Sequence, residues 1–312
     1  MARRILPLPP PARAGVALSA VSGPDQPFWK EFFLYRADFV GAAQLPAGIV
    51  NADPNAALSY IPFPIKIHTD ADFEWLKTVY TFTDPRVYAR IQDDSSGRRL
   101  HRSTLDLRGA AGFGINLSAL TGLANIESTS FAPFILPEPY TIAAGTTFSI
   151  DAADFSGAPN TVRVTLHGNK VRPGYAPWEV DENGQPRGYR ARVPFVIVLP
   201  PDGTTMSLGA NQTVNLAAPM DMEGDFLVLR VTAIHTGSAL IQLQDGSGRD
   251  RLWQDAAVDI SNLAGNGPFP MILPSPRFVY RGSSIQAQIQ ETSGATNRVK
   301  FFFHGVKLYA AD

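Results

Sequence analysis

The stretch FILPEPYTIAAGTTFSIDAADFSGAPNTVRVTLHGNK, residues 134 to 170, recurs as MILPSPRFVYRGSSIQAQIQETSGATNRVKFFFHGVK, residues 271 to 307. Matching positions lie 137 residues apart throughout, without a gap. The shared positions include an ILPxP segment, a Ser-Gly-Ala turn and a closing HGxK motif, as in the pairs Pro137/Pro274, Ser156/Ser293 and His167/His304. Such a period is far longer than the roughly 20–50 residues of solenoid or propeller repeats. The sequence therefore predicts two globular copies of one domain.

The composition indicates short strands joined by turns. The 312 residues include 26 Gly and 26 Pro, and only 18% are charged. The net charge of -1 gives no basic surface for nucleic acid, and the absence of cysteine excludes disulfides and thiolate metal sites. No apolar run approaches the roughly 20 residues of a membrane-spanning helix, and prolines interrupt the apolar core that a signal peptide would need in MARRILPLPPPARAG.

We expect an all-β chain of two tandem antiparallel β-sandwich, jelly-roll-like domains. Apolar and aromatic runs of strand length are bounded by Gly, Pro, Asn and Asp throughout, and only residues 111–126 leave room for a turn or two of helix. The predicted organisation is an extended Pro-rich arm (1–27), copy one (28–171), a linker or hairpin (172–187) and copy two (188–312). The closing strands are expected to end at His167 and His304.

Weaker matches extend each copy upstream. Tyr35-Arg36-Ala37 aligns with Tyr189-Arg190-Ala191 at an offset of 154, and Asp72-Phe73 aligns with Asp225-Phe226 at an offset of 153. Between Arg98 and Pro133 copy one carries about 14 more residues than copy two, which predicts a loop that could make contacts.

Possible metal ligands have structural interpretations that we favour. A ligand cluster needs further His or carboxylate side chains at suitable spacing, and His167 and His304 lie in strands that offer none. Turns held by side-chain oxygens are indicated by Asp93, Asp94 and Ser96 in copy one and by Asp245 and Ser247 in copy two. We favour this over an EF-hand calcium loop because the glutamate that closes such a loop is missing. Calcium near Asp70, Asp72 and Asp94 stays open. We therefore predict no metal, cofactor or catalytic residues.

Enzyme motifs are missing from the sequence. It contains no GxSxG elbow, phosphate-binding loop, dinucleotide glycine motif or HExxH motif. A carboxylate pair for glycoside hydrolysis cannot be identified among 28 acidic residues. Four tryptophans, Trp29, Trp75, Trp178 and Trp253, could form a carbohydrate-stacking platform, although Trp75 is expected in the core and Trp178 at the surface.

The repeated pattern resembles tailed-bacteriophage virion proteins. The resemblance rests on the Asp-Phe strands (Asp72-Phe73, Asp225-Phe226), the Ser-Gly-Arg turns (96–98, 247–249), the ILPxP segments and the HGxK motifs, and it covers about two-thirds of the chain. It implies a non-enzymatic structural protein, either a capsid decoration (cement) protein or a minor head protein. The N-terminal arm and the insertion in copy one lie outside this pattern.

The expected partners follow from that resemblance and from the low charge. They are the major capsid protein or other virion proteins and further copies of this chain, without nucleic acid or membrane, and the expected location is the virion. Tandem modules can also bind with avidity. The alternative is a carbohydrate- or receptor-binding β module of a tail or head fibre.

Overall fold

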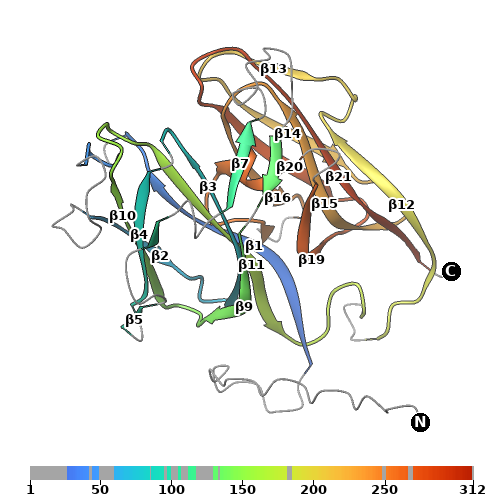
Figure 1. The fold of residues 1–312 in the computed structure, drawn as a ribbon. Helices are drawn as coiled ribbons and strands as arrows, with labels where there is room; N and C mark the ends of the chain where they lie inside the picture. The colour runs from blue at the N-terminus through green and yellow to red at the C-terminus, as the bar shows by residue number, and fades with distance from the viewer. Residues whose placement is uncertain are drawn as a thin grey trace, which may run out of the picture.

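The computed structural model describes residues 27–310, apart from 42–43, 49–59, 85, 95–96, 100–104, 107–111, 117–128, 133, 181–184, 248–250 and 266–269. The described residues form two β-sandwiches, which we call copy one and copy two (Figure 1). The predicted all-β fold is confirmed. The predicted arm lies outside the described residues, Pro27 excepted. In the described part no helix is long and apolar enough to cross a membrane.

Copy one consists of two facing sheets. Its strands are β1 (Phe28–Phe39), β2 (Ile61–Lys66), β3 (Asp72–Phe82), β4 (Val87–Asp93), β5 (Arg98–Arg99), β6 (Leu105–Asp106), β7 (Gly112–Asn116), β8 (Thr129–Ala132), β9 (Phe134–Ile142), β10 (Thr147–Asp154) and β11 (Val162–Pro173). One sheet has the order β1-β11-β3, with β9 beside the first half of β3 and β7 beside its second half; the other has the order β2-β10-β4, followed by β5 and β6.

Copy two repeats this arrangement. Its strands are β12 (Tyr189–Leu199), β13 (Met206–Leu208), β14 (Thr213–Pro219), β15 (Asp225–His235), β16 (Ala239–Asp245), β17 (Arg251–Leu252), β18 (Val258–Asp259), β19 (Met271–Val279), β20 (Ser284–Glu291) and β21 (Asn297–Ala310). The sheets have the orders β12-β21-β15-β19 and β14-β20-β16-β17. In both copies the first strand pairs with the last, and the last but one pairs with an early strand of the other sheet, β2 in copy one and β14 in copy two, which is the jelly-roll connectivity.

The strands follow from alternation of apolar and polar side chains. In β4, Val87, Ala89 and Ile91 are buried while the residues between them are half-buried, and β16 has the same pattern with Ala239, Ile241 and Leu243 inside. A face of buried side chains from each sheet makes the core of each sandwich. The core cluster of copy two also takes in Phe32, Leu34 and Val79 from copy one, while the remaining core of copy one forms a separate cluster.

The structure corrects the predicted ends of the closing strands. β11 and β21 continue to Pro173 and Ala310, so His167 and His304 lie in mid-strand. The glycine of each HGxK motif lies where the pairing with the neighbouring strand shifts register. A Cβ at Gly168 would overlap the carbonyl oxygen of Glu74, and one at Gly305 would overlap that of Leu227. The motif therefore encodes a close approach of two strands.

The alignment of the first strands at an offset of 154 is wrong. Tyr35 pairs with Leu166, while Ile197 pairs with Phe303, the residue 137 positions after Leu166. Ile197 therefore corresponds to Tyr35, an offset of 162 (35 to 197). The shared Tyr-Arg-Ala tripeptide gave the wrong alignment because the register of a strand is set by which of its faces is buried.

The insertion in copy one, predicted as a loop, includes the strand β8. Gly112 in β7 pairs in parallel with Val79, and Gly265 forms the equivalent parallel bridge with Thr232 in copy two, so Gly112 and Gly265 correspond at an offset of 153. The offset then falls to 137, and the extra residues therefore number 16, inserted between β7 and the ILPxP segment. The one-turn helix α3, Ile260–Leu263, was missed because four residues carry no helical periodicity.

Candidate functional site

The three aspartates left open as calcium ligands are engaged in other contacts. Asp70 makes ion pairs with Lys170 and Arg172 at 3.0 and 2.7 Å, and Asp72 accepts a hydrogen bond from the amide of Ala144. Burial by itself would raise the pKa of Asp70, but hydrogen bonds and charge interactions with the two cations lower it. Among the described residues no three His, Asp or Glu side chains gather as a possible metal site.

Of the aspartates predicted to hold turns, Asp245 does so, whereas Asp93 accepts a hydrogen bond from the Tyr140 hydroxyl at 3.3 Å. Asp245 accepts hydrogen bonds from the amide of Ser247 at 2.9 Å and from the hydroxyl of Ser283 at 2.7 Å. In copy one, Asp94 accepts hydrogen bonds from Gln92 and Ser149, while Ser96 lies outside the described residues. These contacts have a structural role.

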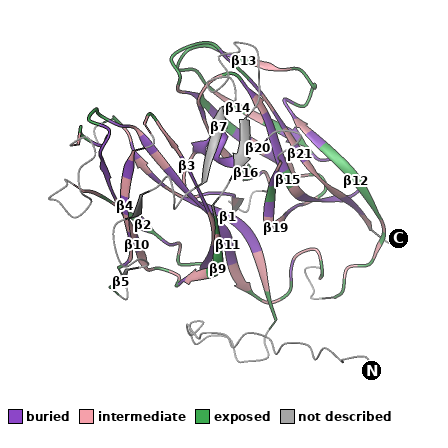
Figure 2. Cartoon of the chain, viewed as in Figure 1, coloured by how far each residue is buried: buried purple, intermediate pink, exposed green. Residues whose placement is uncertain are grey.

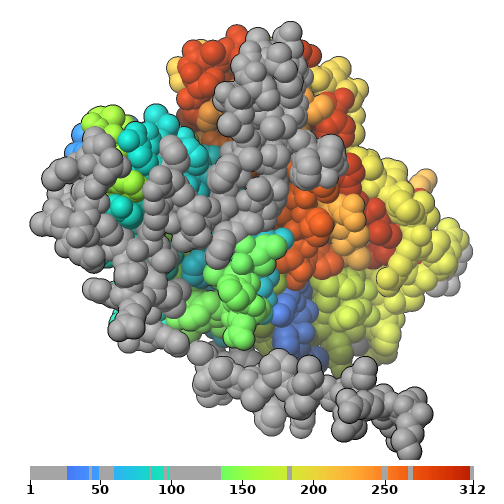
Figure 3. All heavy atoms as spheres, in the orientation of Figure 1, coloured from blue at the N-terminus to red at the C-terminus, as the bar shows by residue number. Residues whose placement is uncertain are grey.

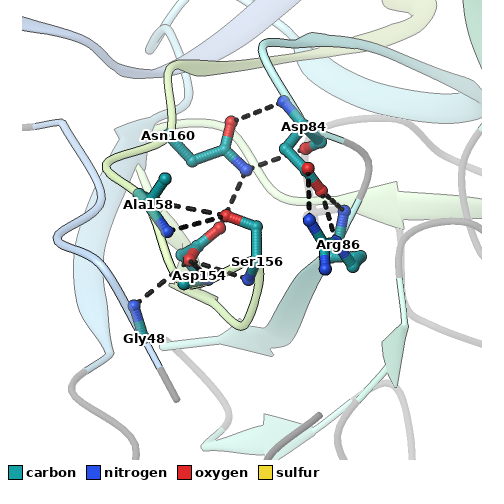
Figure 4. Close-up of polar contacts among 8 residues, drawn as sticks. Gly48, Asp84, Arg86, Asp154, Ser156, Ala158 and Asn160 are labelled. Atoms are coloured by element: carbon teal, nitrogen blue, oxygen red, sulfur yellow. Dashed lines mark hydrogen bonds and ion pairs between the residues drawn. The ribbon is translucent and has the colours of Figure 1, made fainter. Parts of the chain in front are cut away.

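The repeated Ser-Gly-Ala-x-Asn motif ties two turns together (Figure 4). Asp154 accepts hydrogen bonds from the amides of Ser156 and Gly157, and the side chain of Asn160 bridges Asp154 and the backbone of Asp84. In copy two, Glu291 accepts hydrogen bonds from the amides of Ser293 and Gly294. The side chain of Asn297 bonds the backbone of the 236–238 turn. Asn160 and Asn297 are fully buried. The motif therefore satisfies buried backbone groups and does not form a reactive serine.

The tryptophans do not form an exposed stacking platform. Trp75 and Trp253 are 3% and 0% exposed. Trp178, predicted at the surface, packs edge-on against Trp29 and tilted against Phe278, with ring centroids 5.9 and 6.1 Å apart. Stacking of sugars would need coplanar exposed rings, so these residues give the carbohydrate-binding alternative no support.

The outer face of the sheet β1-β11-β3 in copy one is covered by copy two; we call it the covered face. Its central row is Leu34, His167 and Lys77, which pair across the three strands. Phe32, Leu34, His167 and Val79 are 0% exposed. In Figure 3 the blue atoms of β1 lie directly against the orange atoms of copy two. The edge of copy two formed by residues 253–255, α3 and β19 lies on this face.

Main-chain and side-chain hydrogen bonds fix this contact. The amide of Leu34 donates to the carbonyl oxygen of Trp253 at 3.1 Å, and its carbonyl oxygen accepts from the amide of Asp255 at 3.1 Å. Asn262 of α3 donates to the Thr165 hydroxyl at 3.1 Å. A segment of copy two thus pairs with the free edge of β1, so this edge of the sheet is not left open.

A buried ion pair lies at the same contact. Arg277 of β19 is 1% exposed and lies 2.8 Å from Glu31 of β1. It also donates hydrogen bonds to the carbonyl oxygens of Phe32 and Leu252, at 3.3 and 3.2 Å. Arg172 forms a second ion pair with Glu31 at 3.0 Å. Two cations and two carbonyl groups therefore offset the cost of burying these charges.

His167 is neutral in this contact. It lies against Phe32, with ring centroids 6.4 Å apart. Burial, with a smaller contribution from Lys77, lowers its pKa to about 3. The histidine of the HGxK motif is therefore a packing residue between the copies, as the sequence interpretation of a structural histidine required.

The corresponding face of copy two is exposed; we call it the open face. Its central row is Val196, His304 and Arg230, which take the places of Leu34, His167 and Lys77. Beside them lie Val198 and Phe302. Val196 is 45% exposed, and most of β12 is coloured as exposed in Figure 2. A strip of apolar side chains thus faces solvent where copy one has a buried contact.

Strand β12 also presents a strand edge. Within the described part of the chain β12 pairs with β21 alone, so the backbone of Val196 has the place that Leu34 has in β1. His304 accepts or donates a hydrogen bond with Thr232 at 3.0 Å, and partial burial, followed by the charge of Arg230, lowers its pKa. The open face thus combines the apolar side chains of Val196, Val198 and Phe302 with His304, Arg230 and Lys300. Sequence reasoning missed it because an apolar strand residue reads as core.

No protein-family model matches the sequence, and no curated protein matches it. Among solved structures, the major capsid protein P2 from bacteriophage PM2 is 13% identical, with 91% of this chain and 99% of that chain covered and a TM-score of 0.19. The N-terminal CBM22-1–CBM22-2 tandem domain of Xyn10C from Paenibacillus barcinonensis is 6% identical, with 87% and 100% covered and a TM-score of 0.15. At such TM-scores neither similarity carries an argument, and the fold rests on the strand pairings described above.

Proposed function

We propose that this chain is a non-enzymatic structural protein of a phage virion, which binds and stabilises the capsid as a decoration or minor head protein. The observation that supports this most strongly is the open face. It is a half-exposed apolar strip at a position where the same fold, in the same chain, has a buried protein contact.

The jelly roll is consistent with this role but does not decide it. The fold serves viral capsid proteins, and it also serves lectins and cupins. A rigid pair of copies suits a shell because docking surfaces on the two copies keep a fixed distance and angle to one another. The packing of Phe32, Leu34 and Val79 into the core of copy two and the Glu31–Arg277 ion pair support that rigidity.

The occupant that we propose for the open face is a second copy of this chain. In copy two the surface that covers copy one includes β19, and its counterpart in copy one is β9. Ile135 of β9 is 64% exposed and is available to a neighbouring chain. Contact between β9 of one chain and the open face of the next would be head-to-tail, and such contacts close into rings or extend into helical filaments.

Complementary variants test this contact. Size-exclusion chromatography with light scattering should show concentration-dependent assembly of the wild-type chain, and Val196→Asp or Ile135→Asp should each remain monomeric. A mixture of the two variants should form dimers that grow no further, because each contributes one intact surface. Met222→Asp, at an exposed residue elsewhere (73% exposed), is the control and should assemble normally. A wild-type monomer at all concentrations, or assembly of Val196→Asp, would contradict the proposed contact.

The virion role itself is tested on particles. Purified particles should contain this chain in a fixed ratio to the major capsid protein, and particles without it should open at lower temperature. Only a few copies per particle would contradict the stabilising role and would indicate a neck or tail position.

A further inference from the structure

A second surface of copy two is lined by amide side chains. Strands β14, β20 and β16 lie side by side (Figure 1), and their outer face contains a groove of about 310 Å³. Its side chains include Asn215, Gln242, Gln244, Gln286, Gln288 and Ala217. We call this surface the glutamine face. It belongs to the sheet opposite the open face.

The amides form a regular grid. Asn215, Gln288 and Gln242 pair across the three strands, and the next row is Ala217, Gln286 and Gln244. Neighbouring rows on one face of a strand are roughly 7 Å apart, and neighbouring strands about 4.8 Å. Ala217 is short where its neighbours are long, so the surface is recessed at that position.

The amides also hold one another in place. Gln244 Nε2 donates to Gln286 Oε1 at 2.6 Å, and Gln288 Nε2 donates to Asn215 Oδ1 at 3.3 Å. Gln286 Nε2 donates in turn to the hydroxyl of Ser284 at 3.3 Å. Each amide has two N–H hydrogens and a carbonyl oxygen with two lone pairs, so these bonds leave donors and acceptors for a ligand.

The same positions in copy one have a different chemistry. By strand register, Arg90, Gln92, Ser149 and Asp151 correspond to Gln242, Gln244, Gln286 and Gln288. A polar strand face therefore does not require amides in this fold. In copy two, Gln242 and Gln288 stand where copy one has a cation and an anion, and these amides both donate and accept hydrogen bonds.

We propose that the glutamine face binds a neutral polysaccharide chain. Sugar hydroxyls both donate and accept hydrogen bonds, as amides do, and the lining residues carry no charge that would favour an ionic ligand. A groove of this size lies at the lower end of the range for ligand sites, which suits a few sugar units of an extended chain. The site lies on a different sheet from the open face, so this inference stands apart from the proposed assembly.

Affinity electrophoresis tests the site. The full chain is run in native gels containing dextran, galactomannan, xylan or mixed-linkage β-glucan, with anionic alginate as a fifth polymer. We expect retardation by at least one neutral polymer and none by alginate. Gln244→Ala with Gln286→Ala should raise the dissociation constant about tenfold, because two hydrogen-bonding side chains are lost.

Matched variants separate binding from folding. Gln92→Ala with Ser149→Ala removes the corresponding pair from copy one and should leave retardation unchanged. Gln288→Glu keeps the size of the side chain and should weaken binding by placing a charge in a neutral groove. Val196→Asp should bind as the wild type does, whatever its assembly. Retardation by no neutral polymer, equal retardation by alginate, or unchanged retardation of a double glutamine variant with wild-type melting temperature would overturn the proposal.

Discussion

The covered face and the open face are built from corresponding residues of one repeated fold, yet one is core and the other is surface. Leu34 is 0% exposed and Val196 is 45% exposed, although both lie at the same position beside the histidine of an HGxK motif. The difference lies in what packs on each sheet. The alternation of side chains along a strand fixes which of them point away from the core of the sandwich. Neighbouring chain segments decide whether those side chains are exposed to solvent or covered.

The buried ion pair should give the largest effect on stability. Arg277→Ala leaves Glu31 buried with fewer partners, and we expect it to lower the free energy of unfolding by about 3–5 kcal/mol. Arg281→Ala, at an exposed arginine two residues after β19, should change it by less than about 0.5 kcal/mol. Urea denaturation measures both. Equal effects would mean that the contact between the copies does not depend on this pair.

Truncation at matched positions tests the comparison directly. Leu34→Ala removes a fully buried side chain and should cost about 2–5 kcal/mol. Val196→Ala removes a half-exposed one and should cost less than about 1 kcal/mol in the monomer. If urea denaturation at low concentration gives similar losses, the open face is already covered within one chain and the comparison fails.

The histidines should differ in their dependence on pH. The folded pKa of His167, about 3, lies below the ordinary value of 6.5, so the unfolded chain takes up the proton first. Its stabilising contribution is complete above pH 6.5 and declines as the pH falls toward 3, by about 1.4 kcal/mol per pH unit.

Glutamine variants isolate this contribution. Between pH 6.5 and pH 5, His167→Gln should lose about 2 kcal/mol less unfolding free energy than the wild type. His304→Gln should differ from the wild type by a smaller amount, because His304 is only partly buried. Chemical denaturation at the two pH values gives these differences. Parallel losses in the wild type and His167→Gln would show that His167 is protonated in the folded state.

Copy two differs from copy one on its other sheet as well, where Gln242 and Gln288 replace Arg90 and Asp151. In β20 the alternation of Ile285, Ala287 and Ile289 with glutamines is legible in the sequence. The sequence does not show that β14 and β16 lie on either side of β20 and add their own amide side chains to the same face. Cross-strand neighbours come from segments 42 to 73 residues away, so composition within one strand does not reveal the grid.

The sequence by itself determined the tandem repeat, the all-β class and the constant closing segment, because alternation of side chains and turn residues is a local property of the chain. It also indicated that the repeated histidines and Ser-Gly-Ala turns are structural. The tertiary structure decided the register of β12, the mid-strand place of His167 and the strand character of the insertion. It also decided which of two equivalent faces is buried. These depend on pairing between distant segments, where a shift of one residue exchanges the two faces of a strand, and local sequence does not specify that choice.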